Sequence, residues 1–343
     1  MDALLSLPVL IGLIVVALAF DFLNGLHDAA NSIATIVSTR VLRPRHAVAW
    51  AAFFNFIAFL VFGVHVAQTV GVGIVAADVI DARVIFGALM GAISWNLITW
   101  WAGIPSSSSH ALIGGLVGAG VMKAGGAAPV WAGLVKTGAA IVGSPLTGFF
   151  LALLIVLTVS WLFVRATPSA VDRTFRLLQF VSASLYSLGH GGNDAQKTMG
   201  IVAGALYTAG FMSKSDMLTN WGRYRWPIIL AAHAAIAAGT YFGGWRIVHT
   251  MGQKITKLKP LGGFCAESAG AITLFGTALA GIPVSTTHTI TGAIVGVGAV
   301  HRLSAVRWGV AGRIVWAWVL TIPASAIVAA STFFLIHSIH PQG

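Results

Sequence analysis

The sequence has few charged residues and almost no cysteine. Only 8% of its 343 residues are Asp, Glu, Lys or Arg, whereas 57% are hydrophobic and the mean hydropathy is +0.88. Because a water-facing surface carries roughly 25–35% charged residues, this composition excludes a soluble enzyme, a disordered regulator and a coiled-coil scaffold, and it predicts a protein embedded in a bilayer. Cys265 is the single cysteine, which excludes an internal disulfide, and no Cys/His spacing of a zinc site occurs.

Basic residues outnumber acidic ones, 20 to nine, which gives a net charge of +11. They lie in short groups between apolar stretches, so nucleic acid is not an expected partner. Cytoplasmic loops of membrane proteins carry an excess of Lys and Arg. On that rule the cytoplasmic groups are Arg40/Arg43/Arg45, Arg165/Arg173/Arg176, Arg246/Lys254/Lys257/Lys259 and Arg302/Arg307. The residues then facing outwards are Arg83, Lys123, Lys214, Arg223 and Arg225, together with both termini.

Apolar stretches alternate with these groups along the whole chain. They cover roughly 8–38, 47–68, 84–102, 107–122, 128–164, 176–210, 226–245, 262–280, 284–300 and 308–337, and one helical crossing needs about 20 residues. Lipid offers no partners for free backbone groups, so all of them should be helical. The pairs 84–102 with 107–122 and 262–280 with 284–300 are each either two spans or one re-entrant hairpin.

The chain contains an internal repeat. Gly103–Gly120, GIPSSSSHALIGGLVGAG, aligns without a gap with Gly281–Gly298, GIPVSTTHTITGAIVGVG, and nine of the 18 positions are identical. Upstream, residues 24–31 align with 190–197 and share a Gly, an Asp and an Ala. We therefore expect an all-α polytopic membrane protein made of two inverted-topology repeats, 1–165 and 176–343, joined by a cytoplasmic connector at 166–175. Such repeats place a transported substrate near the membrane midplane, between discontinuous helices.

Each aligned hairpin carries a Pro followed by Ser or Thr just before an apolar helical run. Free N–H groups and the positive end of the dipole at a helix start attract an anion, and hydroxyl groups add donors. The candidate substrate-binding residues are Ser106, Ser107, Ser108, Ser109, Ser285, Thr286 and Thr287. The alternative is that these side chains only cap the hairpin helices.

Buried acidic residues form the second group of candidates. Asp28 and Asp194 lie in polar segments that are expected to interrupt helices, and Glu267 is the only glutamate. Carboxylates at membrane depth usually belong to an ion or proton pathway. Asp21, seven residues before Asp28, lies on a similar helical face. Alternatively, a carboxylate only holds helices together, for instance Asp194 with Lys197 at i, i+3.

Amide and imidazole side chains complete this second group. Asn31 and Asn193 could supply oxygen ligands to Na⁺ or partners to a proton site. His27 and His190 lie within the repeated motifs and could relay protons, because histidine titrates near neutral pH.

These motifs resemble those of the inorganic phosphate transporter family, the Pit or Pho4 type, over essentially the whole chain. The resemblance is carried by the paired Asp motifs, the paired Pro-Ser/Thr-His hairpins and Ala266-Glu267. It implies secondary transport of orthophosphate by alternating access, with the substrate between the two hairpins and two broken helices. Asp28, Asn31, Asn193 and Asp194 match the family's coupling and substrate positions, and the resemblance implies no resident cofactor.

Two substitutions within the motifs point to one branch of that family. Sodium-coupled members tend to repeat Asn-Asp-x-x-Asn, whereas here His27 and Lys197 replace two of the Asn residues, and a cation at Lys197 would compete with bound Na⁺. The chain is thus similar to the bacterial low-affinity Pit branch, which implies proton-coupled import of a metal-phosphate complex. The divalent metal is then a co-substrate, and the location is the plasma membrane, the inner membrane of a bacterium. Sulfate or another oxyanion, Na⁺ coupling and a homodimer stay open.

Two other classes of function are less favoured. An intramembrane hydrolase could use Ser, His and Asp, but no Gly-x-Ser-x-Gly elbow occurs, so the chain is not expected to be an enzyme. An anion channel could use the same helix starts, but buried carboxylates in the path would oppose anion flow.

Overall fold

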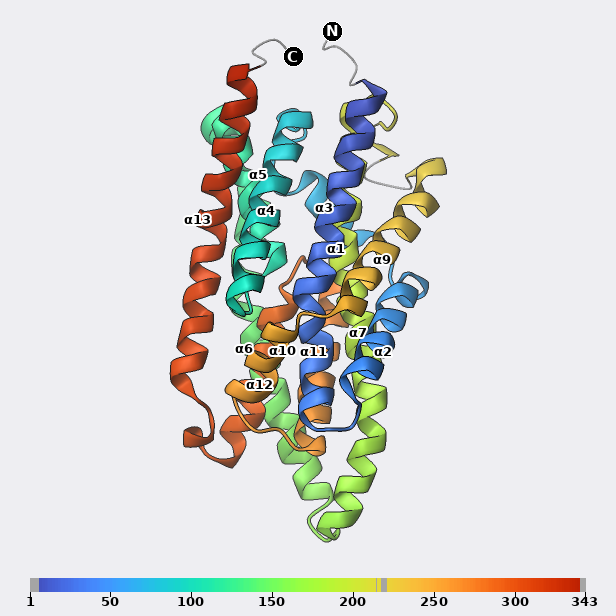
Figure 1. Ribbon diagram of the computed structural model, residues 1–343, viewed down its shortest axis with the longest axis vertical. Coiled ribbons are helices and arrows are strands. Elements are labelled where there is room, and N and C mark those ends of the chain that lie inside the picture. Colours follow the sequence, from blue (N-terminus) through green and yellow to red (C-terminus); the bar gives the residue numbers. More distant parts are fainter. Residues whose placement is uncertain (1–5, 214, 217–220, 340–343) are drawn as a thin grey trace.

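The computed structural model describes residues 6–213, 215–216 and 221–339, and these are almost entirely helical (Figure 1). The helices are α1 (Leu7–Ser38), α2 (Pro44–Ile57), α3 (His65–Val72), α4 (Ala82–Ala102), α5 (Ser108–Ala124), α6 (Trp131–Leu162), α7 (Pro168–Thr208), α9 (Arg225–Phe242), α10 (Trp245–His249), α11 (Pro260–Leu279), α12 (Thr286–His301) and α13 (Trp308–Ile339). Pairing of extended backbone in the described residues is limited to one isolated bridge, between Val75 and Pro129. The predicted all-α class is confirmed.

Several helices are long and apolar enough to cross a bilayer. Within the described residues, four qualify alone, namely α1, α4, α6 and α13, and the count rises to six if α2 with α3 and α9 with α10 each form one bent span. These pairs bend by 87° and 63°. The second bend is at Gly243, whose φ of +74° favours glycine. The chain is a multi-pass membrane protein, as predicted.

The helices that carry the aspartate motifs are not interrupted. The sequence predicted breaks around Asp28 and Asp194, and this prediction was wrong, because α1 and α7 pass through both positions as continuous helices of 32 and 41 residues. Their polar side chains are buried against other helices and find partners there, so the backbone does not have to open. Helix α7 also begins at Pro168, so most of the expected connector is helical.

Helices α4 and α5 form one hairpin and helices α11 and α12 form another. Figure 1 shows the first in the half of the molecule that holds both termini and the second in the opposite half. The turn of each hairpin points to the middle of the molecule, where Ser109 Oγ lies 3.5 Å from Val284 O and the rings of His110 and His288 are 4.5 Å apart. Each pair therefore enters from one end and turns back inside the protein.

Each hairpin packs on the long helix that follows the other hairpin. Helix α13 contacts α4 and α5, and α6 contacts α11 and α12. Aligned glycines allow this approach, because a Cβ on Gly118 would lie 2.2 Å from Ala326 O and one on Gly296 would lie 2.4 Å from Phe149 O. Only 22% of the most apolar window of α6 and of α13 is buried in the protein, so the rest of each helix is available to lipid.

The connections that carry most of the predicted cytoplasmic basic groups lie together. The loops between α1 and α2, α6 and α7, and α12 and α13, and the segment before α11, are at the end opposite to the termini (Figure 1). Arg176 donates to Arg40 O at 3.1 Å, and Arg307 N donates to Ile255 O at 2.9 Å. Lys214, expected to face outwards, lies outside the described residues.

Candidate functional site

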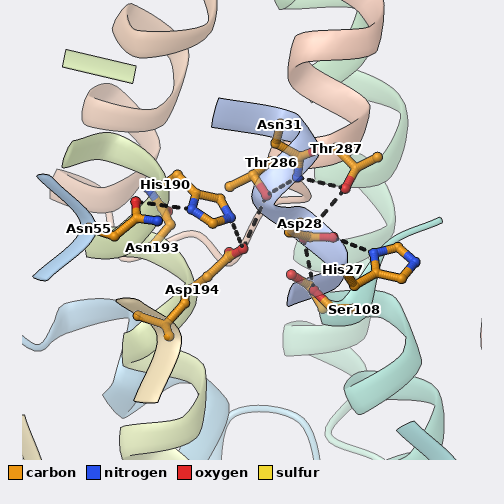
Figure 2. Close-up of polar contacts among 12 residues, drawn as sticks. His27, Asp28, Asn31, Asn55, Ser108, His190, Asn193, Asp194, Thr286 and Thr287 are labelled. Carbon is orange, nitrogen blue, oxygen red and sulfur yellow. Dashed lines mark hydrogen bonds and ion pairs between the residues drawn. The ribbon is translucent and has the colours of Figure 1, made fainter. Parts of the chain in front are cut away.

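Most of the predicted site residues meet where the two hairpin turns contact α1 and α7. These helices contribute acidic, amide and imidazole side chains, and the hairpin turns contribute hydroxyl groups (Figure 2). All of these side chains are buried. Polar side chains at such depth are stable only with partners, so their contacts define the site.

Asp28 on α1 contacts both hairpins. Its Oδ1 lies 2.6 Å from His27 Nδ1, and its Oδ2 accepts a hydrogen bond from Ser108 Oγ at 3.1 Å. Thr287 of the second hairpin donates to the same oxygen at 3.5 Å. One turn along α1, the Asn31 amide donates to the hydroxyl groups of Thr286 and Thr287 at 3.2 and 2.9 Å.

Asp194 on α7 has the stronger set of partners. Lys197 forms an ion pair with its Oδ1, His190 Nε2 lies 3.2 Å from its Oδ2, and Thr286 donates to Oδ2 at 3.1 Å. The Lys197 ammonium group also donates to Ser109 Oγ and, at 2.9 Å, to Val284 O. Lys197 therefore connects α7 to both hairpin turns.

The two aspartates lie close to each other. One ligand atom from each of Asp28, His190 and Asp194 falls within 4.8 Å of the other two. Carboxylate oxygens and imidazole nitrogens are common ligands of divalent metals. The two halves of the site thus converge on one small volume instead of forming separate sites.

The hydroxyl groups of the hairpins divide into two roles. Ser107 and Ser285 are N-caps of α5 and α12, and each accepts the N–H group of the histidine three residues later at 3.2 Å. For these two residues the capping alternative describes the contacts. Ser108, Ser109 and Thr286, with Thr287, instead bond to the side chains of α1 and α7.

Two predicted residues lie outside this cluster. The Asn193 amide donates to Gly189 O of its own helix and to Leu274 O of α11, and the second bond joins α7 to α11. Glu267 on α11 accepts three hydrogen bonds, and its donors are Thr35 Oγ1 at 2.5 Å, Gln179 Nε2 at 3.0 Å and Ser182 Oγ at 2.5 Å. Glu267 is therefore the centre of a second polar cluster, between α1, α7 and α11.

Three further residues were not found from the sequence. Thr99 on α4 bridges His27 Nε2 and Ser106 Oγ, at 3.0 Å to each. Asn55 on α2 lies 3.2 Å from His190 Nδ1, and Tyr186 donates to Thr286 O at 3.0 Å. For Asn55, the signal in the sequence is an isolated polar residue within an apolar run.

Comparison with known proteins gives one consistent picture. Residues 24–329 match the model of the phosphate transporter family. The chain is 68% identical to a probable low-affinity inorganic phosphate transporter of Rhizobium meliloti (strain 1021), covering 97% of this chain and 98% of that one. A protein of the same name from Bacillus subtilis (strain 168) is 43% identical over 99% of this chain and 100% of its own. A solved structure described as the sodium-dependent phosphate transporter superposes with a TM-score of 0.87 at 26% identity, covering 97% of this chain and 100% of that chain.

Proposed function

The chain belongs to the phosphate transporter family, and on that premise we propose that it imports inorganic phosphate by proton symport. It is a multi-pass protein of the plasma membrane. The observation that carries the proposal is the meeting of two opposed hairpin turns with Asp28 and Asp194 in one buried volume. Hydroxyl groups at helix starts bind the oxyanion. The carboxylates repel it, so binding requires a proton or a cation that offsets their charge.

Charge balance supports a metal-phosphate complex as the transported form. Asp28 and Asp194 contribute two negative charges, and Lys197 compensates one of them. An anion entering this volume meets a net negative charge, which is costly in a medium of low dielectric constant. A divalent cation bound to the phosphate, or protons, removes this cost. The three groups that converge within 4.8 Å would contact the metal as part of the cargo.

Lys197 supports protons over sodium as the coupling ion. Its ammonium group is bonded to Asp194, Ser109 Oγ and Val284 O, which are the kinds of oxygen atom that would coordinate a sodium ion. The solved relative is described as sodium-dependent, but its identity to this chain is only 26%. Sodium coupling is therefore the second candidate.

The arrangement of helices supports alternating access by two inverted repeats. The hairpins enter from opposite ends of the molecule, and aligned glycines make equivalent contacts with α13 and α6. In this mechanism the halves rock about the site, so that the hairpin turns open to one side at a time. We assign Glu267 to coupling as well, because its donors come from α1 and α7 and would move relative to α11.

Uptake of labelled phosphate into proteoliposomes tests the proposal. An imposed inward proton gradient, with Mg²⁺ present, should drive saturable uptake in the parent protein, and a protonophore should abolish it. Ser108→Ala/Thr286→Val removes hydroxyl groups from both hairpins and should abolish uptake, whereas Ser160→Ala on the exposed face of α6 should not change it. Full uptake in the double variant contradicts the proposal. Stronger inhibition by sulfate than by unlabelled phosphate would instead favour a sulfate permease.

A further inference from the structure

Four carboxylates are buried in the part of the chain that the structure describes, and Asp21 differs from the other three. Asp28 is bonded to His27 and Ser108, and Asp194 forms an ion pair with Lys197. Glu267 accepts hydrogen bonds from three donors. Asp21 on α1 is 0% exposed, neither of its carboxylate oxygens has a well-aligned hydrogen bond among the described residues, and its polar neighbours are Thr198 and Asn24. An ionised carboxylate in this position is very costly, and such a group takes up a proton instead.

The polar neighbours of Asp21 can bond to both forms of its carboxyl group. Asn24 lies three residues further along α1, on the same face, and Thr198 approaches from α7. Asn24 Oδ1 and Thr198 Oγ1 are also buried and lack well-aligned hydrogen bonds in the described chain. The Asn24 amide NH₂ group and the Thr198 hydroxyl group can donate to an ionised carboxylate, and Asn24 Oδ1 and Thr198 Oγ1 can accept from a protonated one. The surroundings therefore suit a group that binds and releases a proton.

Few other charged groups act on Asp21. Asp194 and Lys197 of α7 are the ones that interact with it electrostatically, and they are paired with each other. Helix α9, which packs along α1, has His233 as its buried titratable side chain, and His233 Nδ1 is bonded to Ile229 O. Helix α4 carries Arg83 near its start, where it bonds to His337. Among the described residues, no cationic side chain forms an ion pair with Asp21, and Lys197 acts on it while paired with Asp194.

We propose that Asp21 is the residue that binds and releases the coupling proton. This inference rests on proton-coupled phosphate transport as the function. The proton binds to a carboxylate oxygen of Asp21 while that oxygen is open to the outside, and it leaves to the inside after the halves rock. Asp28, which is bonded to His27 and Ser108, and Asp194, which is paired with Lys197, act on the cargo. Proton binding and cargo binding are thereby assigned to different carboxylates of α1 and α7, and Glu267 links the movement of these two helices to α11.

Asp21→Asn tests this assignment. The amide has nearly the same shape and can donate to Asn24 Oδ1, but it cannot release a proton. Uptake driven by a proton gradient should fall to the level of empty liposomes, while exchange of labelled for unlabelled phosphate at equal pH continues at the parent rate. Asp78→Asn, at an exposed position between α3 and α4, should preserve both activities.

The contrary outcomes are distinct. Proton-driven uptake at the parent rate in Asp21→Asn overturns the assignment, and so does equal loss of uptake and exchange in a folded protein. Should Asp21→Asn not fold, Asp21→Glu keeps an exchangeable proton and should keep proton-driven uptake; its loss with exchange retained also overturns the assignment. A parent protein with neither activity would instead contradict the proposed function.

Discussion

Lys197 and Asn31 occupy aligned positions in the two halves, three residues after Asp194 and Asp28. Asn31 donates to two threonine hydroxyl groups, whereas Lys197 brings a positive charge to Asp194 and to both hairpin turns. Breaking a buried ion pair by removing one partner leaves an uncompensated charge and costs about 3–5 kcal/mol. The difference between the halves is therefore electrostatic, because Lys197 compensates the charge of one aspartate whereas Asn31 compensates none.

Lys197→Asn should make the protein depend on sodium. The amide replaces the ammonium group by an oxygen ligand and leaves space for a cation beside Asp194, Ser109 and Val284 O. We expect the thermal midpoint of the purified variant to be lower than that of the parent in choline chloride and to rise on addition of sodium chloride. Lys136→Asn, at an exposed position of α6, should show no such response. Equal responses to sodium in the parent and Lys197→Asn contradict this explanation.

Glu267→Gln separates a coupling role from a structural one. The hydroxyl groups of Thr35 and Ser182 can rotate to meet the amide, so the loss of stability should be small, about 1 kcal/mol. If Glu267 takes part in coupling, phosphate uptake should nevertheless be lost. We would measure the thermal midpoint and uptake on the same preparation. Uptake at the parent rate with a lowered midpoint would limit Glu267 to joining α1, α7 and α11.

At the scale of elements, the two hairpins depend on close backbone contact with α6 and α13. Gly118 and Gly296 occupy positions where a Cβ atom would overlap a carbonyl oxygen of the neighbouring helix. Such contacts let small residues bring membrane helices together. These contacts also fix how deep each hairpin turn lies in the protein, and hence the position of its hydroxyl groups relative to the aspartates.

The same substitution should have opposite effects at two glycines. Gly118→Ala places a Cβ 2.2 Å from Ala326 O and should destabilise the protein by about 1–3 kcal/mol through overpacking. Gly138→Ala on α6 meets no atom within 4 Å and should stabilise its helix by about 0.5–1 kcal/mol. Thermal midpoints of the two variants check both signs. A stabilising Gly118→Ala would mean that α5 and α13 are further apart than described.

The repeat in the sequence was enough to predict the two Pro-Ser/Thr hairpins and the equivalence of Asp28 and Asp194, but it left open whether each hairpin is re-entrant or two spans. It was not enough to locate the helix breaks. The polar motifs looked like interruptions, but their side chains have partners on other helices, and the bends occur instead between α2 and α3 and between α9 and α10. Thr99 and Asn55 join the site through contacts 72 and 135 positions apart in the chain, which no local pattern reveals.

The whole molecule has two different ends, one with the basic loops and one with both termini. The loops rich in Lys and Arg lie opposite to the two termini, and the hairpins point towards each other from the two ends (Figure 1). Because the positive-inside rule makes the basic end cytoplasmic, the hairpin of α4 and α5 should enter from outside and that of α11 and α12 from inside. Rocking of the halves would then expose the site to each side in turn.

Labelling of single cysteines tests this orientation. Cys265 is buried, so Cys265→Ala gives a background without thiols. In that background we expect a membrane-impermeant maleimide to label Gly126→Cys, in the exposed turn between α5 and α6, on intact cells. Ala166→Cys, in the exposed loop between α6 and α7, should react only after permeabilisation, because α6 crosses the membrane between the two positions. Labelling of both on intact cells would show that α6 does not cross, and the reverse pattern would place the basic loops outside.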